Sequence, residues 1–356
     1  MDTQKLDQTY IANTYARFPV TIVKGKGSLV WDDTGKEYID LSTGIAVDIF
    51  GVADEEWMAA VTKQLGTLQH ISNLYYTEPC VKLAQMLCEK TGMKKVFFGN
   101  SGAEANECAI KAARKWSEEK KGKDYSTIIT LKNSFHGHTI TTLAATGQDV
   151  FHHDFTPLTE GFVYAEPNDL ANLEQLIKAN KCAAVMMEVV QGEGGVMPLD
   201  EAYVKGAAKL CEQYDLLLIC DEVQVGNGRS GKLYGYMHYG VQPDIVSTAK
   251  GLAGGLPLGA TLLGEKVQDV LSAGTHGSTF GGNPVCCAGA INVLSRLDEK
   301  MLEGVEERSA YIKQELTGAK GVLGVSGLGL MLGIQTEKNA SDIIAACREK
   351  GVLVIK

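Results

Sequence analysis

The stretch LLLICDE at residues 216–222 decides the fold of this chain. Its apolar residues are followed directly by a carboxylate at Asp221. A short apolar run bounded by polar residues is typical of a strand buried in a sheet. A second stretch, DIVSTAKGLAGG at residues 244–255, repeats the pattern with Lys250 after the run and a glycine loop behind it. Because ligands bind outside the carboxyl ends of parallel strands, Asp221 and Lys250 are candidate functional residues.

Apolar runs alternate with segments of helical composition along the chain. The runs cover residues 96–98, 127–131, 183–190, 216–220, 245–248 and 260–263. Between them, residues 103–115 and 201–213 combine helix-forming residues with helical apolar spacing. This alternation predicts an α/β fold with a mostly parallel central sheet flanked by helices.

The two ends of the chain have a different pattern. Residues 23–41 predict a hairpin outside the main sheet, with Asp32, Asp33 and Gly35 in its turn. Beyond Asn283 we expect a helix over 288–316, a strand over 330–336 and a helix over 341–350. We divide the chain into a segment 1–45 that contributes to a small domain, a large ligand-binding domain 46–285, and a small α+β domain 286–356. The last residues, GVLVIK, have the pattern of a strand with nothing after it, so we expect a truncated small domain.

Composition excludes several classes of function. The net charge is −9 with both signs interspersed, so nucleic acid and anionic membranes are poor partners. No apolar stretch approaches the about 20 residues of a membrane span, and the first residues lack a signal-peptide core, so we expect a cytoplasmic protein. The 9 cysteines contain no CxxC pair, which argues against a disulfide framework or a zinc site.

A third candidate feature is FFGNSGAEA at residues 97–105, which places Ser101, Gly102 and Ala103 between a strand and a helix start. Backbone N–H groups at such a start bind phosphate. Each pattern also has an ordinary structural explanation, such as a helix cap, a turn or a surface charge. Together, however, an amine, a strand-end carboxylate and a phosphate site match one ligand, pyridoxal 5'-phosphate, through its aldehyde, its ring nitrogen and its phosphate.

Two other patterns point to other classes of protein. GNGRSG at residues 226–231 spells a dinucleotide-binding fingerprint, but no helical pattern follows it, which disfavours a dehydrogenase. His136, His138, His152 and His153 lie close in sequence without HExxH or cysteine-pair spacing, so we expect no metal site.

The strongest motifs resemble those of class III aminotransferases of PLP fold type I, and among these the acetylornithine aminotransferases of arginine biosynthesis. The matching segments are residues 97–114, 134–147, 186–196, 216–236, 243–260 and 276–285, within a match from about Tyr15 onward. The resemblance implies transamination of N-acetylornithine with 2-oxoglutarate to N-acetylglutamate 5-semialdehyde and glutamate. Transaminases for ornithine, succinylornithine or 4-aminobutyrate share the cofactor motifs and remain alternatives.

The resemblance also implies roles for individual residues. Lys250 carries the cofactor as a Schiff base and moves the proton, and Asp221 pairs with the pyridine nitrogen. The remaining cofactor contacts it implies are Ser101, Gly102, Ala103, Phe135, His136, Glu222, Val223, Gln224 and Thr279. Thr279 is expected to reach the phosphate of a neighbouring subunit, which makes the active site shared within a homodimer. The implied substrate contacts are Tyr75, His138, Glu193 and Ser278.

Two positions depart from the pattern of this family. His138 and Ser326 stand where arginines for substrate carboxylates are expected. Neither side chain reproduces the paired hydrogen bonds of a guanidinium. The sequence therefore leaves open a changed substrate, a PLP-binding protein of impaired activity, or arginines supplied from elsewhere in the fold.

Overall fold

The computed structural model describes residues 2–356 and contains a seven-stranded central sheet. Its strands, in spatial order, are β4 (Lys95–Gly99), β12 (Gly259–Leu263), β11 (Ile245–Thr248), β10 (Leu217–Asp221), β7 (Cys182–Met187), β5 (Thr127–Leu131) and β6 (Phe162–Ala165). Strand β12 pairs antiparallel with β11 and β4, and the remaining pairs of this sheet are parallel. The predicted α/β class with a mostly parallel sheet is confirmed.

Both faces of this sheet are buried, which is why its strands are continuous apolar runs. Along β10, Leu217 and Ile219 belong to one apolar core, and Leu218 and Cys220 belong to the core on the opposite face. Helix α5 (Gly102–Lys121) covers the first core. The other core is covered by α4 (Glu78–Thr91), α7 (Leu170–Ala179), α8 (Glu201–Gln213) and α9 (Pro284–Arg296). The helices predicted over 103–115 and 201–213 are α5 and α8.

The central strands follow the predicted apolar runs with two differences. Strand β6 has no counterpart among those runs, because it is a short edge strand that is only partly buried. The run 183–190 is also divided: β7 ends at Met187, and β8 (Val190–Gln191) pairs with β9 (Met197–Pro198) in a separate ribbon. This division leaves Glu188 at the carboxyl end of β7.

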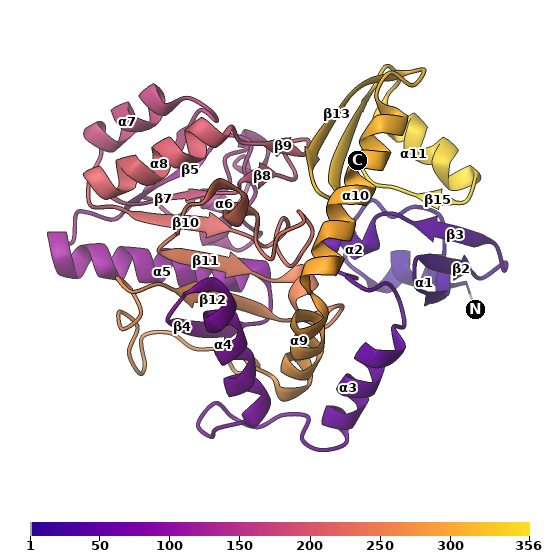
Figure 1. Ribbon diagram of the computed structural model, residues 1–356, viewed down its shortest axis with the longest axis horizontal. Coiled ribbons are helices and arrows are strands. Elements are labelled where there is room, and N and C mark those ends of the chain that lie inside the picture. Colours follow the sequence, from indigo (N-terminus) through magenta and orange to yellow (C-terminus); the bar gives the residue numbers. More distant parts are fainter. Residues whose placement is uncertain (1) are drawn as a thin grey trace.

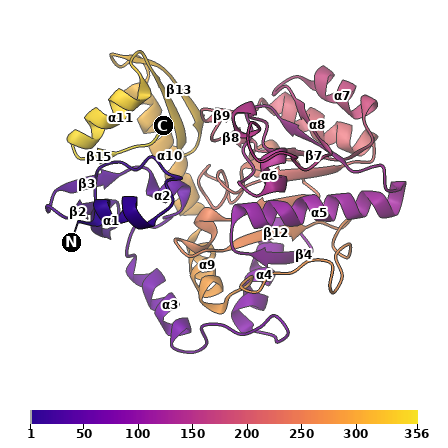
Figure 2. The same ribbon diagram turned by 180° about the vertical axis from the view of Figure 1, so that it is seen from behind.

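A smaller α+β part joins the two ends of the chain (Figures 1 and 2). Its elements are β1 (Ile22–Lys26), β2 (Leu29–Asp32), β3 (Glu37–Asp40), α10 (Glu299–Leu316), β13 (Val322–Leu328), β14 (Met331–Thr336), α11 (Ala340–Glu349) and β15 (Val352–Leu353). The predicted hairpin is β2 and β3, and Gly35 in its turn has φ +87°. The carboxyl-terminal strand β15 pairs in parallel with β3.

One expectation about this half of the chain needs correction, and the domain boundary stays a proposal. The helix expected over 288–316 is two helices, because Asp298 caps α10 by accepting the N–H of Met301 at 2.8 Å. The boundary expected after residue 285 falls in the first turn of α9, whose buried side chains belong to the core beside the central sheet. We propose that the boundary of the small domain follows α9.

The remaining helices are α1 (Thr3–Tyr10), α2 (Thr43–Ala46), α3 (Glu55–Leu65) and α6 (Ile140–Ala145). None of the helices within residues 2–356 has both the length and the apolar character needed to cross a membrane.

Candidate active site

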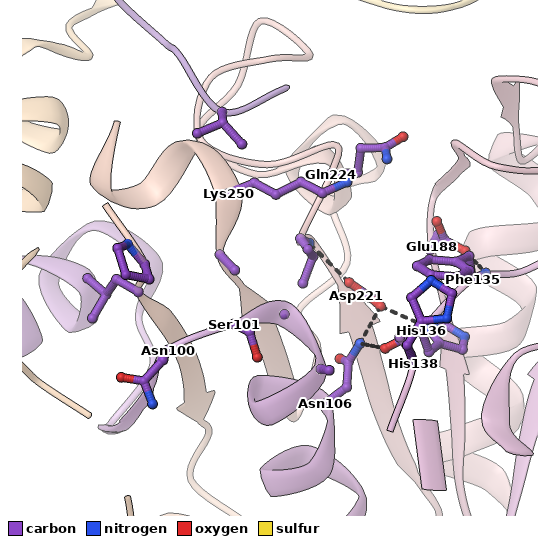
Figure 3. A pocket seen from close by; sticks show the side chains of 18 of the residues that line it. Asn100, Ser101, Asn106, Phe135, His136, His138, Glu188, Asp221, Gln224 and Lys250 are labelled. Carbon is purple, nitrogen blue, oxygen red and sulfur yellow. Dashed lines mark hydrogen bonds and ion pairs between the residues drawn. The ribbon is translucent and has the colours of Figure 1, made fainter. Parts of the chain in front are cut away.

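The two strand ends singled out by the sequence meet at one cavity of about 500 Å³ (Figure 3). Asp221 is the last residue of β10, and Lys250 begins a short 3-10 turn just after β11. Strands β10 and β11 are parallel neighbours, so their carboxyl ends lie side by side. The sheet therefore brings the carboxylate and the amine to the wall of the same cavity.

Asp221 is held in place by three hydrogen bonds. Its Oδ2 receives one from Nδ2 of Asn106 at 2.8 Å and lies 2.8 Å from Nδ1 of His136, while Oδ1 accepts the N–H of Val223 at 3.0 Å. The residue is only 3% exposed, and no lysine or arginine pairs with it in the part of the chain that the structure describes. A buried carboxylate in this setting favours a cationic partner from the cavity.

Lys250 is half-buried and has a left-handed backbone with φ +48°. Burial lowers the pKa of its amine, and the negative charges of Glu193, Asp221 and Glu188 oppose that shift. A lowered pKa increases the neutral, nucleophilic fraction of the amine at a given pH. Lys250 is thus suited to attack a carbonyl carbon held in the cavity.

The amino end of α5 forms the opposite wall. Ser101 caps this helix by accepting the N–H of Glu104 at 3.2 Å, and Gly102 and Ala103 form its first turn. A Cβ added at Gly102 would lie 2.7 Å from Cγ1 of Val223, so the backbone passes too close to the 223 loop for a side chain. Exposed N–H groups and the helix dipole make this turn an anion site.

Four further predicted residues line the cavity. The rings of Phe135 and His138 meet edge to face with their centroids 5.1 Å apart. Gln224 lies so close to Gly192 that a Cβ on that glycine would overlap its Oε1. Glu193, on the turn that follows β8, is exposed. These side chains surround the space between Lys250 and the amino end of α5.

Other predicted residues lie outside the lining of this cavity. The carboxylate of Glu222 accepts the N–H groups of Gly235 and Tyr236 at 2.7 and 2.8 Å, and burial raises its pKa to about 8. Thr279 and Tyr75 are exposed, and the Ser278 hydroxyl accepts a hydrogen bond from Nδ2 of Asn100.

Ser326, which stands at an expected arginine position, is also absent from this lining. It lies on β13, where its buried hydroxyl faces Gly333 of β14.

Asn106 and Glu188 are among the residues of the cavity wall that sequence reasoning missed. Glu188 directly follows β7, and Asp221 is the last residue of β10, so the same strand-end rule could have found Glu188. Asn106 lies one turn into α5 and gave no signal of its own, because an asparagine within a helical pattern has no fixed role.

These residues fit pyridoxal phosphate. Lys250 matches the aldehyde, Asp221 the ring nitrogen, and the Ser101–Ala103 turn the phosphate. Two buried polar atoms of the wall, Oδ1 of Asn106 and Nε2 of His136, have no hydrogen-bond partner among the described residues. Within residues 2–356, no group of three or more histidine, cysteine or acidic side chains is placed to bind a metal ion.

Comparison with known proteins supports the same class of enzyme. A sequence model of the family "Aminotransferase class-III" matches residues 10–356. The chain belongs to this family. An acetylornithine aminotransferase from Haemophilus ducreyi is 49% identical over 354 residues, covering 99% of this chain and 90% of that protein.

Solved structures agree with the sequence comparison. N-acetylornithine aminotransferase from Stenotrophomonas maltophilia superposes with a TM-score of 0.85 at 36% identity, covering 99% of this chain and 89% of that chain. An ornithine aminotransferase from Toxoplasma gondii, described with partial occupancy of PLP at its active site, has a TM-score of 0.93 at 35% identity and covers 98% and 85%. The predicted family and fold type are confirmed.

Proposed function

We propose that this chain is a PLP-dependent transaminase that moves the side-chain amino group of N-acetylornithine to 2-oxoglutarate, yielding N-acetylglutamate 5-semialdehyde and glutamate. The convergence of Lys250, Asp221 and the Ser101–Ala103 turn on one cavity carries the proposal for the reaction type. The 49% identity to an acetylornithine aminotransferase carries the proposal for the substrate.

Pyridoxal phosphate, when bound, supplies an electron-accepting ring for the electron pair released at the amino-bearing carbon of the donor. Asp221 would hold a proton on the ring nitrogen, because its carboxylate is buried and favours a cation in contact with it. Phe135 would pack on the ring face, and Gln224 would hydrogen-bond the ring hydroxyl. The Ser101–Ala103 turn would hold the phosphate through its N–H groups.

Lys250 would have two tasks. Its Nζ would attach the cofactor, and after the donor displaces it, the same amine would take the proton from the amino-bearing carbon. Burial lowers the pKa of this amine, which favours the neutral form needed for both tasks. His138 and Glu193 line the cavity and would contact the substrate.

We place the protein in the cytoplasm. A homodimer would complete its active site. Four large apolar side chains are exposed on two loops: Leu74, Tyr75, Tyr76 and Phe280. Tyr76 is 99% exposed. Asn73 donates hydrogen bonds to the carbonyls of Ser278 and Gly281, so these loops are adjacent. Such an apolar face fits a second copy of the chain, and Thr279 beside it would reach the phosphate of that copy.

The test measures each half-reaction separately. Purified holoenzyme is mixed rapidly with N-acetylornithine, ornithine, 4-aminobutyrate or glutamate, and the visible band of the cofactor is followed. Loss of the band with both N-acetylornithine and glutamate supports the proposal. A band lost with ornithine or 4-aminobutyrate but not with N-acetylornithine contradicts the substrate, and a band that no donor changes contradicts the reaction.

A further inference from the structure

Glu188 and Asp221 are neighbours at the same edge of the central sheet. In the parallel pair β7 and β10, Met187 is in register with Cys220, so the next residue on each strand is a carboxylate. Both side chains line the cavity, and Glu188 is only 6% exposed. Two buried carboxylates side by side repel each other unless a cation lies nearby or one binds a proton.

His136 lies beside Asp221 in this cluster (Figure 3). Its Nδ1 lies 2.8 Å from Oδ2 of Asp221, and its ring is buried. Burial lowers the pKa of this imidazole, but the hydrogen bond to Asp221 and the charges of Asp221 and Glu188 raise it by more, so the net pKa is above its ordinary value. An imidazolium here would lie in contact with Asp221 and would also be stabilised by the charge of Glu188.

A hydrogen bond from the backbone helps to hold Glu188 in place. Its Oε1 accepts the N–H of Phe135 at 2.8 Å. Burial raises the pKa of Glu188 to about 7, and His136 opposes the rise while Asp221 adds to it. The other charged groups of the cavity are Lys250 after β11 and Glu193 on the turn after β8. The buried carboxyl of Glu222, next to Asp221, is bound to N–H groups outside the cavity lining.

We propose that Glu188 is a positioning residue that acts as the outer counter-charge of the cofactor site. Its carboxylate keeps the proton on His136, so that Asp221 stays ionised between the imidazolium and the protonated ring nitrogen. The charges are then positive on the ring nitrogen, negative on Asp221, positive on His136 and negative on Glu188, so that they cancel within the buried cluster. This inference rests on the proposed function, since it requires the ring nitrogen at Asp221.

The experiment titrates the visible absorbance of the holoenzyme with pH in the absence of substrate. Glu188→Gln removes the charge with little change in volume, and we expect the midpoint to fall by about one pH unit or more, because the protons on the cofactor lose a buried counter-charge. Glu188→Asp keeps the charge and should stay near the wild-type midpoint. Glu212→Gln on the exposed face of α8 is the control, since that carboxylate lies outside the cavity lining.

Two results overturn the inference. One is a Glu188→Gln midpoint equal to that of the wild type. The other is an equal shift in Glu188→Asp and Glu188→Gln, which would show that only the hydrogen bond to Phe135 matters. A wild-type protein that shows no cofactor band overturns the proposed function instead, so the two failures are distinguishable.

The wild type alone provides a second measurement if Glu188→Gln does not fold. At a pH of about 7, the infrared band of protonated carboxyls should lose intensity when pyridoxal phosphate binds, because Glu188 gives up its proton, while the buried Glu222 carboxyl, whose pKa is raised to about 8, keeps its own. A band that cofactor binding leaves unchanged overturns the inference.

Discussion

The cofactor side and the substrate side of the cavity are built differently. On the cofactor side, Asp221 is 3% exposed and is held by hydrogen bonds from α5, the 136 segment and its own loop. The expected substrate contacts lie on loops, and one of them, Tyr75, is 65% exposed. The difference teaches that the central sheet positions the residues proposed for the chemistry, whereas the residues proposed for substrate binding lie on loops.

The largest effect should follow from the loss of Lys250. We expect Lys250→Ala to reduce turnover by at least about 10³-fold, because both the attachment point and the proton-transfer amine are removed. Steady-state assays with N-acetylornithine measure this loss, and Lys209→Ala on the exposed face of α8 is the control. Activity within tenfold of the wild type would contradict the assignment of Lys250 to the chemistry on the cofactor side.

Asp221→Asn should have the next largest effect. The amide keeps the shape of the side chain but loses the charge that stabilises a proton on the ring nitrogen. We expect kcat to fall by about 10²-fold, in line with an electrostatic contribution of about 2.7 kcal/mol. Single-turnover kinetics at saturating donor measure it, and an unchanged kcat in a variant that retains its cofactor would show that Asp221 is structural.

Gly102→Ala tests how tightly the phosphate turn is built. The added Cβ would lie 2.7 Å from Cγ1 of Val223, so either the helix start or the 223 loop must shift. We expect the Kd for pyridoxal phosphate to rise about tenfold, which corresponds to about 1.4 kcal/mol. Fluorescence titration of the cofactor-free protein measures it. Gly66→Ala, where the added Cβ meets only ordinary contacts, should leave the Kd unchanged.

The cofactor side was also the part that the sequence predicts best. Strands buried on both faces are continuous apolar runs, so a polar residue that ends such a run, as Asp221 does, stands out. Glu188 was missed because the apolar residues after it hide the point where β7 ends.

The roles predicted for residues on exposed loops stay predictions. Tyr75 lies outside the cavity lining, as does Thr279, which is expected to act in a neighbouring subunit, and no local pattern states where an exposed loop will be placed. The division of residues 288–316 into two helices depends on one cap, at Asp298, inside an otherwise continuous helical pattern.

His138→Ala tests the substrate side, and we expect a smaller effect on kinetics than from the cofactor-side variants. The ring lines the cavity but is exposed, so any contact with a charged substrate is screened by water. We expect KM for the donor to rise about threefold to tenfold while kcat stays within about twofold, as for a contact made equally in the ground and transition states. A drop in kcat with unchanged KM would show that His138 acts in the chemical step and not in substrate binding.

The smallest effect on activity should come from the small sheet. Hydrogen bonds from Thr34, Tyr38 and the N–H of Lys36 lower the pKa of Asp32 to about 2 against the opposing effect of burial. A folded-state pKa below the unfolded value stabilises the fold above pH 3.8, and this contribution is lost as pH falls toward 2. Asp32→Asn should therefore be less stable than the wild type at pH 7, with the gap closing in acid and kcat unchanged.

The most direct test of the central claim is to reduce the holoenzyme with borohydride and map the modified lysine by peptide mass spectrometry. The account predicts one cofactor-derived mass increment, on the peptide that contains Lys250, and none on other lysines. An increment on a different lysine, or none in a protein that has bound pyridoxal phosphate, would contradict the assignment of Lys250 and with it the proposed active site.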